Sequence, residues 1–225
     1  MPQATLYIIG TPIGNLEDIT LRALRVLHEV DLVLAEDTRV TKKLLDRYEI
    51  KKPMWSYHQH SGDGKIKEII KELEAGKNLA LVCDAGTPGI GDPGGKLIEE
   101  ILKSEVQPQI IPVPGANAAI TALSISGFPT DRFLFLGFPP HKKGRETFFK
   151  RVADSDETVV FYESTHRIVK ALSQLPPDRE IMVARELTKK FETIYRGRAG
   201  DIIRQLADPK AETRGEFVVV VRAKK

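Results

Sequence analysis

The sequence predicts an α/β protein of two α/β domains, an N-terminal parallel sheet over residues 1–113 and a C-terminal mixed sheet over residues 114–225. Three observations lead to this fold class. Strand-like apolar runs alternate with amphipathic runs through the first half, which is typical of a parallel sheet covered on both faces. A Pro-Gly pair at 114–115 interrupts the chain. Beyond it, runs 180–186 and 192–198 lie too close together for a helical crossover, so antiparallel pairing is expected.

The first half is expected to contain four strands and four helices. Helix 65–75 is identified by apolar residues at i, i+3, i+4 and i+7 from Ile66 to Leu73, and Gly76 follows it where a C-terminal cap belongs. Helix 20–29 is expected to carry Leu21, Leu24 and Leu27/His28 on one side. The expected strands are 5–10, 31–37, 79–83 and 109–113, and the expected helices are 20–29, 42–48, 65–75 and 96–104.

The second half alternates less regularly, which is why a mixed sheet is predicted there. A helix of small residues at 116–126 follows the Pro-Gly pair, and runs rich in Val, Ile, Phe and Tyr indicate strands. Ser164 or Thr165 is expected to cap a helix that begins there. The strands are placed at 133–138, 158–163, 180–186, 192–198 and 216–223, and the further helices near 146–153, 165–174 and 200–206.

Composition restricts the class of protein. The chain has 41% hydrophobic and 29% charged residues, which suits a globular protein rather than a disordered one. No apolar run approaches the ~20 residues that span a bilayer, and the first residues lack the pattern of a signal peptide. A single cysteine, Cys83, excludes an internal disulfide and a thiolate metal cage. We therefore expect a cytoplasmic protein without a metal.

The segment DAGTPGIGDPG at 84–94 is the most informative motif. Four glycines and two prolines in eleven residues cannot form regular structure. The segment leaves the apolar run 79–83, and ligands of open α/β sheets bind outside the carboxyl ends of strands. A second turn, GTPIG at 10–14, matches neither the dinucleotide nor the nucleoside-triphosphate fingerprint. The sequence thus predicts a cofactor-binding loop of another kind.

Polar residues also follow several other strands. Glu36, Asp37 and Arg39 form either a structural ion-pair network or the surroundings of a substrate hydroxyl. His58 and His60 lack the partners of a metal site, so they either stack on a base or lie on the surface. The net charge of +3 permits a local basic face, and hence a nucleic-acid partner, without requiring one.

Eight motifs in this order carry a resemblance that covers essentially the whole chain: GTPIGNLEDITLRAL, AEDTR, DAGTPGIGDPG, VPGANAA, PTDRFLFLGF, FYESTHR, ARELTK and RGEFVVVV. Together they resemble the ribosomal RNA small-subunit 2'-O-ribose methyltransferases of the tetrapyrrole-methylase-like superfamily. The resemblance implies S-adenosyl-L-methionine as methyl donor and the ribose 2'-hydroxyl of a cytidine in the decoding region of 16S rRNA as substrate. It also implies a homodimer with the donor in an interdomain cleft, and no membrane or DNA partner.

The same resemblance implies the residues of the donor site. These are Pro12, Asp84, Ala85, Gly86, Thr87, Pro88, Ile90, Asn117, Ala118, Tyr162, Glu163, Leu187, Gly215 and Glu216.

For catalysis, Asp37, Glu163 and Glu186 are the candidates for a general base, and Arg39, Arg185 or Lys189 for polarising the hydroxyl or holding its phosphate. RNA binding is assigned to Arg39, Lys42, Lys43, His58, His60, Lys142, Lys143, Arg145, Lys189 and Lys190.

Two other functions stay open from the sequence. A tetrapyrrole C-methyltransferase would use the same donor loop, and a ribosome-assembly factor that binds RNA without catalysis would keep the fold. An NAD-dependent oxidoreductase is disfavoured because its glycine fingerprint is missing.

Overall fold

The computed structural model describes residues 3–92, 94–207 and 214–224. The chain forms two compact units, Met1–Asn117 (unit 1) and Ala118–Lys225 (unit 2). The sequence predicts a domain boundary after residue 113, four residues before the end of unit 1 at Asn117. In the described ranges no helix combines the length and apolar character needed to cross a membrane.

Unit 1 is built on a five-stranded sheet in the order β3-β2-β4-β1-β5, in which every pair of neighbours is parallel. This confirms the parallel sheet predicted for the first half. The elements are β1 (Thr5–Ile9), the 3-10 helix η1 (Leu16–Asp18), α1 (Leu21–Glu29), β2 (Leu32–Ala35), α2 (Thr38–Arg47), β3 (Met54–Ser56), α3 (Asp63–Glu74), β4 (Leu79–Val82), α4 (Gly94–Lys103) and β5 (Gln109–Val113).

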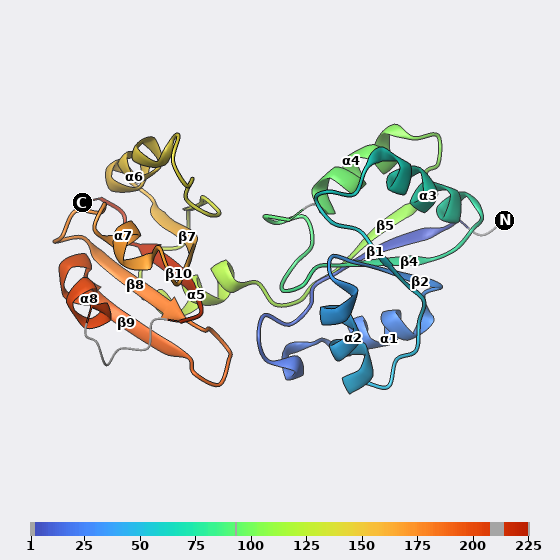
Figure 1. Cartoon of the computed structure of the whole chain (residues 1–225), viewed down its shortest axis with the longest axis horizontal. Coiled ribbons are helices and arrows are strands. Elements are labelled where there is room, and N and C mark those ends of the chain that lie inside the picture. The colour runs from blue at the N-terminus through green and yellow to red at the C-terminus, as the bar shows by residue number, and fades with distance from the viewer. Residues whose placement is uncertain (1–2, 93, 208–213, 225) are drawn as a thin grey trace. The chain divides into compact units, whose positions relative to one another are not determined.

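Two helices cover each face of this sheet (Figure 1). Helices α1 and α2 pack on one face, against the alternate strand residues Ile9, Val33 and Val82. Helices α3 and α4 pack on the other face, against Leu34 and Leu81 among others. Because the neighbouring strands β1 and β4 lead to helices on opposite faces, their carboxyl ends form the switch point at which open α/β sheets bind ligands.

Two details of unit 1 differ from the expectation. Leu21 was expected on the same apolar side of its helix as Leu27, but it is 87% exposed, and α1 buries Ala23, Val26 and Leu27. Strand β3 was not predicted, because it has three residues and none of them is buried. In contrast, α3 buries Ile66, Ile69 and Leu73 as its spacing predicts.

Unit 2 has a mixed sheet in the order β6-β7-β10-β8-β9. Strands β6 and β7 are parallel, and the remaining pairs, including β8 with β9, are antiparallel, which confirms the prediction. The elements are α5 (Ala118–Ser126), β6 (Phe133–Phe135), α6 (Arg145–Asp154), β7 (Thr158–Ser164), α7 (Ile168–Leu172), β8 (Glu180–Arg185), β9 (Thr193–Arg198), α8 (Ala199–Leu206) and β10 (Glu216–Val221).

Helices α6, α7 and α8 form the main core of unit 2 with one face of this sheet, around Phe149, Phe161 and Phe217. Helix α5 lies along strands β7 and β10, and its Ala119 amide donates to the hydroxyl of Tyr162, the residue after Phe161 on β7. Because neighbouring strand residues point to opposite faces, α5 covers the second face.

The predicted cap of the helix after β7 is wrong. Helix α7 begins at Ile168, and Arg167 is its N-cap. The hydroxyl of Thr165 instead exchanges two 2.7 Å hydrogen bonds with Gly215, donating to the carbonyl and accepting from the amide. Thr165 therefore joins the end of β7 to the start of β10.

Candidate active site

Three loops of unit 1, which leave β1, β4 and β5, are bound to one another at the switch point. Thr11 donates its amide to the Gly86 carbonyl at 2.8 Å, and Gly86 returns the bond at 3.1 Å. The Thr11 hydroxyl donates to the Cys83 carbonyl, and the Thr87 hydroxyl to the Ala116 carbonyl. The predicted donor loop is thus held by its neighbours on both sides.

Two glycines allow the first and third of these loops to cross at contact distance. A Cβ built on Gly10 would lie 2.7 Å from the Gly115 Cα, and one built on Gly115 would lie 2.5 Å from the Gly10 carbonyl oxygen. Both obstacles are backbone atoms, which cannot rotate away. Glycine is therefore required at both positions.

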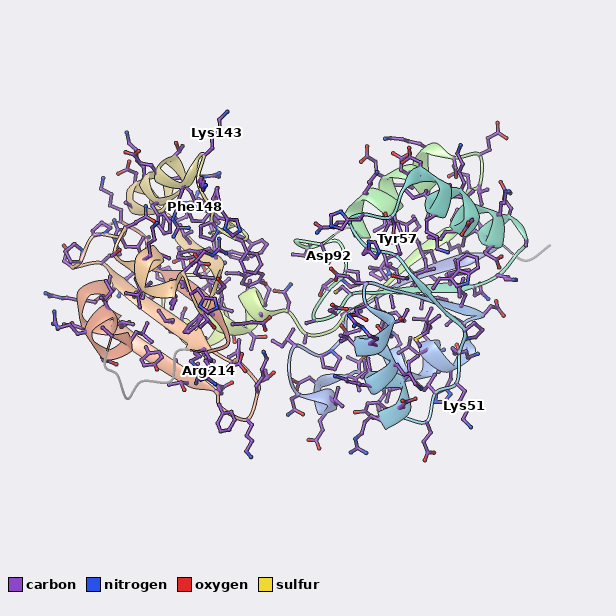
Figure 2. All side chains as sticks on the ribbon, in the orientation of Figure 1. Lys51, Tyr57, Asp92, Lys143, Phe148 and Arg214 are labelled. Carbon is purple, nitrogen blue, oxygen red and sulfur yellow. The ribbon has the colours of Figure 1, made fainter. Side chains whose placement is uncertain are left out.

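The loop 84–94 holds its own shape through the carboxylate of Asp92, which accepts from the amides of Gly89 at 2.8 Å and Gly94 at 2.7 Å. Figure 2 shows Asp92 on this loop. Gly86 and Gly89 have φ of +89°, a conformation that favours glycine. Ile90 is 50% exposed, and the space beside Gly91 is open. The tip of the loop, at Ile90 and Gly91, is thus accessible to a ligand.

Cys83, the last residue before this loop, is buried beneath it. Its Sγ lies 3.4 Å from the carbonyl oxygens of Ala85 and Gly86. Burial raises the pKa of the Cys83 thiol to about 12. This thiol therefore supports the loop and is not a nucleophile.

Three carboxylates gather at the ends of β2 and β4. The Asp84 carboxylate accepts from the Asp37 amide at 2.9 Å, and the Glu36 carboxylate lies 3.4 Å from the Asp84 amide. Desolvation, together with the charge of the neighbouring carboxylate, raises the pKa of both Glu36 and Asp84. Raised pKa values mean that negative charge here is under-compensated, so the group would favour a cationic ligand.

Asp37 differs from these two because it has a cationic partner. Its carboxylate makes bidentate contact with the Arg39 guanidinium, at 2.6 Å for the shortest pair. Those hydrogen bonds hold the pKa of Asp37 at about 2. The structure thus shows an ion pair within this motif, and the pair leaves Asp37 a weak base.

In unit 2, the predicted residues of β8 and β10 meet at one edge of the sheet, because the two strands are antiparallel. The Glu186 carboxylate accepts from the Lys189 ammonium at 2.9 Å and from the Glu216 amide at 3.0 Å, and Lys189 also bonds the Glu216 carboxylate. Burial acts to raise the pKa of Glu186, but these hydrogen bonds outweigh it and the pKa is lowered. A Cβ on Gly215 would meet the Glu186 side chain at 2.5 Å.

The backbone of this loop is strained. Glu186 and Thr188 have φ of +51° and +67°, which non-glycine residues rarely adopt. The buried Arg185 side chain stabilises this loop by donating to the carbonyls of Arg214 and Phe191. Such strain is concentrated at functional sites, since the surrounding contacts must maintain it.

Glu163, predicted as both a donor contact and a base, is fully buried in an ion-pair cluster. Its carboxylate lies 2.8 Å from Arg167 and 3.7 Å from Arg145. Arg145 also donates to Gln174 and to the Pro140 carbonyl. A carboxylate that has no solvent access and lies beside two cations is poorly placed to accept a proton from a substrate. In this structure Glu163 therefore has a structural role.

Arg145, which was predicted to contact RNA, is buried in this structure. Its side chain is 8% exposed, so its guanidinium compensates Glu163 inside unit 2 instead of facing solvent. The other predicted RNA contacts of unit 2 lie at its surface: Lys142 and Lys143 are exposed, Lys143 points away from the ribbon (Figure 2), and Lys190 is exposed beside Lys189.

The predicted RNA contacts of unit 1, Arg39, Lys42, Lys43, His58 and His60, are all exposed. Lys42 pairs with Asp46 at 2.8 Å, and the two histidine rings lie 6.0 Å apart. The three cations lie on α2, which follows β2, and the two histidines lie in the loop after β3. Strands β2 and β3 are parallel neighbours, so both segments follow the carboxyl ends of adjacent strands.

The remaining predicted donor residues lie at loop ends of each unit. Pro12 and Pro88 are buried in unit 1, and Asn117 is half-buried. In unit 2, Leu187 is buried, and the Tyr162 ring packs between Phe135 and Phe138, with centroids at 5.1 and 5.4 Å. Thr11 and the Gly10–Gly115 contact were not among the predicted site residues, although each lies in a motif that the sequence had identified.

Comparison with known proteins defines the class. The profile of the tetrapyrrole (corrin/porphyrin) methylases matches residues 5–203. Solved structures agree on the fold: a diphthine synthase superposes with a TM-score of 0.74 at 15% identity, covering 99% of this chain and 91% of that one. A uroporphyrin-III C-methyltransferase from Thermus thermophilus gives 0.66 at 20% identity, covering 97% and 94%. The chain belongs to the tetrapyrrole methylase family.

Within this family, the sequence is similar over nearly its full length to proteins named ribosomal RNA small subunit methyltransferase I. The relative from Haemophilus influenzae is 45% identical, covering 97% of this chain and 78% of its own length. The relative from Thermotoga maritima is 44% identical, covering 97% and 98%. At this similarity the chain belongs to the small subunit methyltransferase I group, as its motifs indicated.

Membership of this family implies S-adenosyl-L-methionine as the cofactor. The unit 1 loops fit it in two respects. The loop leaves Ile90 exposed and the space beside Gly91 open, so a ligand has room to approach it. The under-compensated carboxylates of Glu36 and Asp84 suit a molecule with a sulfonium and an ammonium group.

Proposed function

We propose that this protein transfers a methyl group from S-adenosyl-L-methionine to the ribose 2'-hydroxyl of a cytidine in the decoding region of 16S rRNA. The observation that carries the proposal is the similarity, over 97% of the chain, to relatives named ribosomal RNA small subunit methyltransferase I. The geometry supports it through the open donor loop of unit 1 and the polar strand ends of both units.

The cofactor supplies an electrophilic methyl carbon on sulfur, which is already a good leaving group. What remains for the protein is to hold the donor and the hydroxyl in line, and orientation of this kind supplies ~7–11 kcal/mol in favourable cases. The crossed loops around Gly10 and Gly115 provide a rigid support for the donor loop. The donor would bind against this loop, where Glu36 and Asp84 would orient its cationic groups.

None of the three candidate carboxylates is suited to take the proton of the hydroxyl. Asp37 has a pKa of about 2, the pKa of Glu186 is lowered, and Glu163 is buried against two arginines. A base contributes about 10²–10⁴-fold. We therefore expect single-turnover rates of the Asp37→Ala and Glu186→Ala variants to fall less than tenfold. A loss of more than a hundredfold in either variant with donor affinity unchanged would restore that carboxylate as the base.

Binding of the RNA falls to the exposed cations Arg39, Lys42, Lys43, Lys142, Lys143 and Lys190, together with Lys189 beside the Glu186 loop. Phosphate contacts of this kind make affinity fall steeply as salt is raised. We also propose that the enzyme acts as a homodimer in the cytoplasm, as the family resemblance implies.

The experiment is methyl incorporation from labelled donor into small ribosomal subunits that lack the modification, followed by mapping of the methylated nucleotide. Incorporation at the 2'-hydroxyl of one cytidine of the decoding region supports the proposal. A parallel reaction offers a tetrapyrrole as the acceptor, and methylation there alone would refute the RNA assignment. Calorimetric titration with S-adenosyl-L-methionine separates the third case, since a non-catalytic assembly factor need not bind it.

A further inference from the structure

The charges of the chain are divided unevenly between its two units. Unit 2 contains 20 Lys and Arg against 14 Asp and Glu, whereas unit 1 contains 14 against 17. The net charge of +3 therefore arises from a cationic unit 2 and an anionic unit 1. Lys142, Lys143, Lys189 and Lys190, which were assigned to RNA from the sequence, account for only part of the excess in unit 2.

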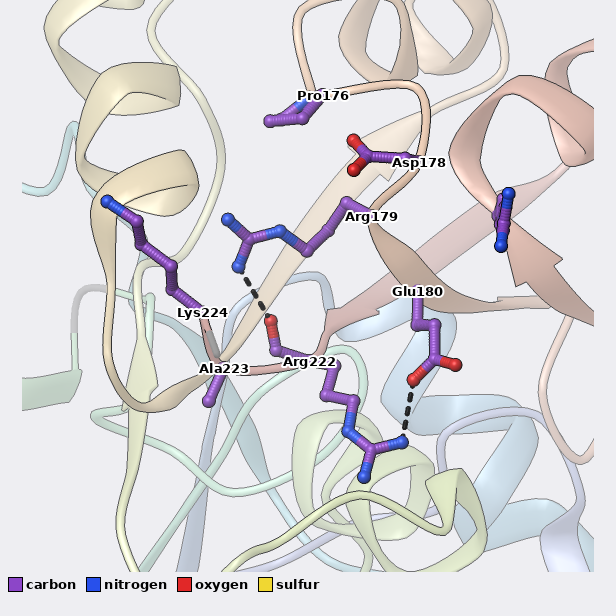
Figure 3. A pocket seen from close by; sticks show the side chains of 8 residues that line it. Pro176, Asp178, Arg179, Glu180, Arg222, Ala223 and Lys224 are labelled. Atoms are coloured by element: carbon purple, nitrogen blue, oxygen red, sulfur yellow. Dashed lines mark hydrogen bonds and ion pairs between the residues drawn. The ribbon is translucent and has the colours of Figure 1, made fainter.

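Part of the remainder lines a cavity of about 460 Å³ in unit 2, where the segment before β8 meets the ends of β9 and β10 (Figure 3). The wall carries four cationic and two anionic side chains: Arg179, Arg198, Arg222 and Lys224, with Asp178 and Glu180; Pro176 and Ala223 complete it. We call this the β8–β10 pocket. It was not predicted from the sequence, because its residues come from three separate segments, 176–180, 198 and 222–224.

The cations of the β8–β10 pocket are only partly neutralised. Arg222 pairs with Glu180 at 2.6 Å, and Lys224 lies 4.0 Å from Asp154. Arg179 donates instead to two carbonyls, those of Arg222 and Ala153, which orient the guanidinium without cancelling its charge. Within the described residues, neither Arg179 nor Arg198 has a carboxylate within ion-pair distance. The pocket therefore has two uncompensated guanidinium groups, which suit phosphate oxygens.

The β8–β10 pocket and the Glu186 loop lie at opposite ends of strand β8. Strand β8 begins at Glu180, on the pocket wall, and ends at Arg185, next to Glu186. Six residues of extended strand separate the two ends by ~17 Å. A nucleic-acid strand that placed one nucleotide at the Glu186 end would bring phosphates to this pocket several nucleotides away.

We propose that the β8–β10 pocket binds the phosphodiester backbone of the substrate RNA at a distance from the methylated ribose. The proposal rests on the proposed function for the identity of the RNA, but it adds a second contact region and a role for Arg198 and Lys224. Such contacts position the RNA and carry no sequence information themselves.

The test uses the double variant Arg198→Glu/Lys224→Glu in the full chain, because neither side chain supports the interior. The matched control is Lys150→Glu/Lys170→Glu, which makes the same change in net charge at exposed positions of α6 and α7, outside the pocket. Binding of each protein to unmodified small subunits is measured from low to high salt. Methylation is measured over a range of subunit concentrations.

We expect the pocket variant to bind subunits at least tenfold more weakly than the control. The slope of its log affinity against log salt concentration should be smaller in magnitude by about 2. Its KM for subunits should rise while kcat and donor affinity stay within about twofold. Affinity and slope equal to those of the control variant would overturn the proposal. The proposal would also be overturned if the pocket bound millimolar inorganic phosphate while the pocket variant bound subunits as the control does, because the pocket would then be a site for a small anion.

A failure of the pocket proposal can be distinguished from a failure of the proposed methyltransferase function. If the pocket variant binds subunits at least tenfold more weakly than the control but the wild-type protein transfers no methyl group, the methyltransferase assignment fails and the pocket assignment stands. If methyl transfer is normal in both variants at every subunit concentration and salt, the pocket assignment alone fails.

Discussion

Replacing Gly10 by alanine should damage both the stability of unit 1 and the binding of the methyl donor. The new Cβ would lie 2.7 Å from the Gly115 Cα, whereas ordinary contact begins at 3.4 Å. The crossed loops must therefore separate by about 0.7 Å, and over-packing of this kind costs ~1–3 kcal/mol. In a chain of this length that loss lowers the Tm by about 2–12 °C.

The separation also displaces Thr11, which holds the donor loop through its two hydrogen bonds with Gly86. We expect donor affinity to fall by about tenfold or more, which is ~1.4 kcal/mol, in calorimetric titrations with S-adenosyl-L-methionine. Gly64→Ala is the matched control, because its Cβ meets open space in α3 and should be neutral or stabilising. The reasoning is refuted if Gly10→Ala matches the control in both Tm and donor affinity.

Three further predictions concern ionisable groups. Glu163→Gln should destabilise the protein by ~3–5 kcal/mol in denaturant unfolding, because it leaves two arginines without their buried counter-charge, and a loss under 1 kcal/mol would contradict that role. Cys83 should resist alkylation at pH 8 in the native protein, since its pKa is about 12, and should react at once in denaturant; rapid native labelling would disprove this. The folded-state pKa of Glu186 is lowered, so its carboxylate stabilises the fold above its ordinary pKa of 4.5 and loses that effect as pH falls below it. The Tm difference between wild type and Glu186→Gln should therefore be greatest near pH 7 and shrink below pH 4.5, and a difference independent of pH would count against the Lys189 contact.

Much of the fold could be predicted from the sequence because its signals are local. The spacing of Ile66, Ile69 and Leu73 places α3 and its buried side, and the short connection between 186 and 192 permits only antiparallel pairing of β8 with β9. The errors arose where local signals are weak. Leu21 fits an apolar pattern but is 87% exposed, whereas α1 buries the side that carries Ala23, Val26 and Leu27.

The candidate site divides in the same manner. The glycine and proline content of 84–94 was sufficient to predict an exposed ligand loop after a strand, and the ordered motifs were sufficient to indicate the family. The ionisation of the carboxylates could not be predicted in this way. Whether Glu163 is a base or a buried counter-ion depends on Arg145 and Arg167, and Arg145 looks like a surface cation in the sequence.

By itself, then, the sequence determined the alternation of strands and helices, the glycine-rich loop after β4 and the family, because each depends on residues close together in the chain. The tertiary structure alone decided that Gly10 meets Gly115, that Arg145 turns inward, and that Arg179, Arg198, Arg222 and Lys224 share one pocket. The physical reason is that steric contact and electrostatic compensation depend on distance in space, which strand order and pairing establish.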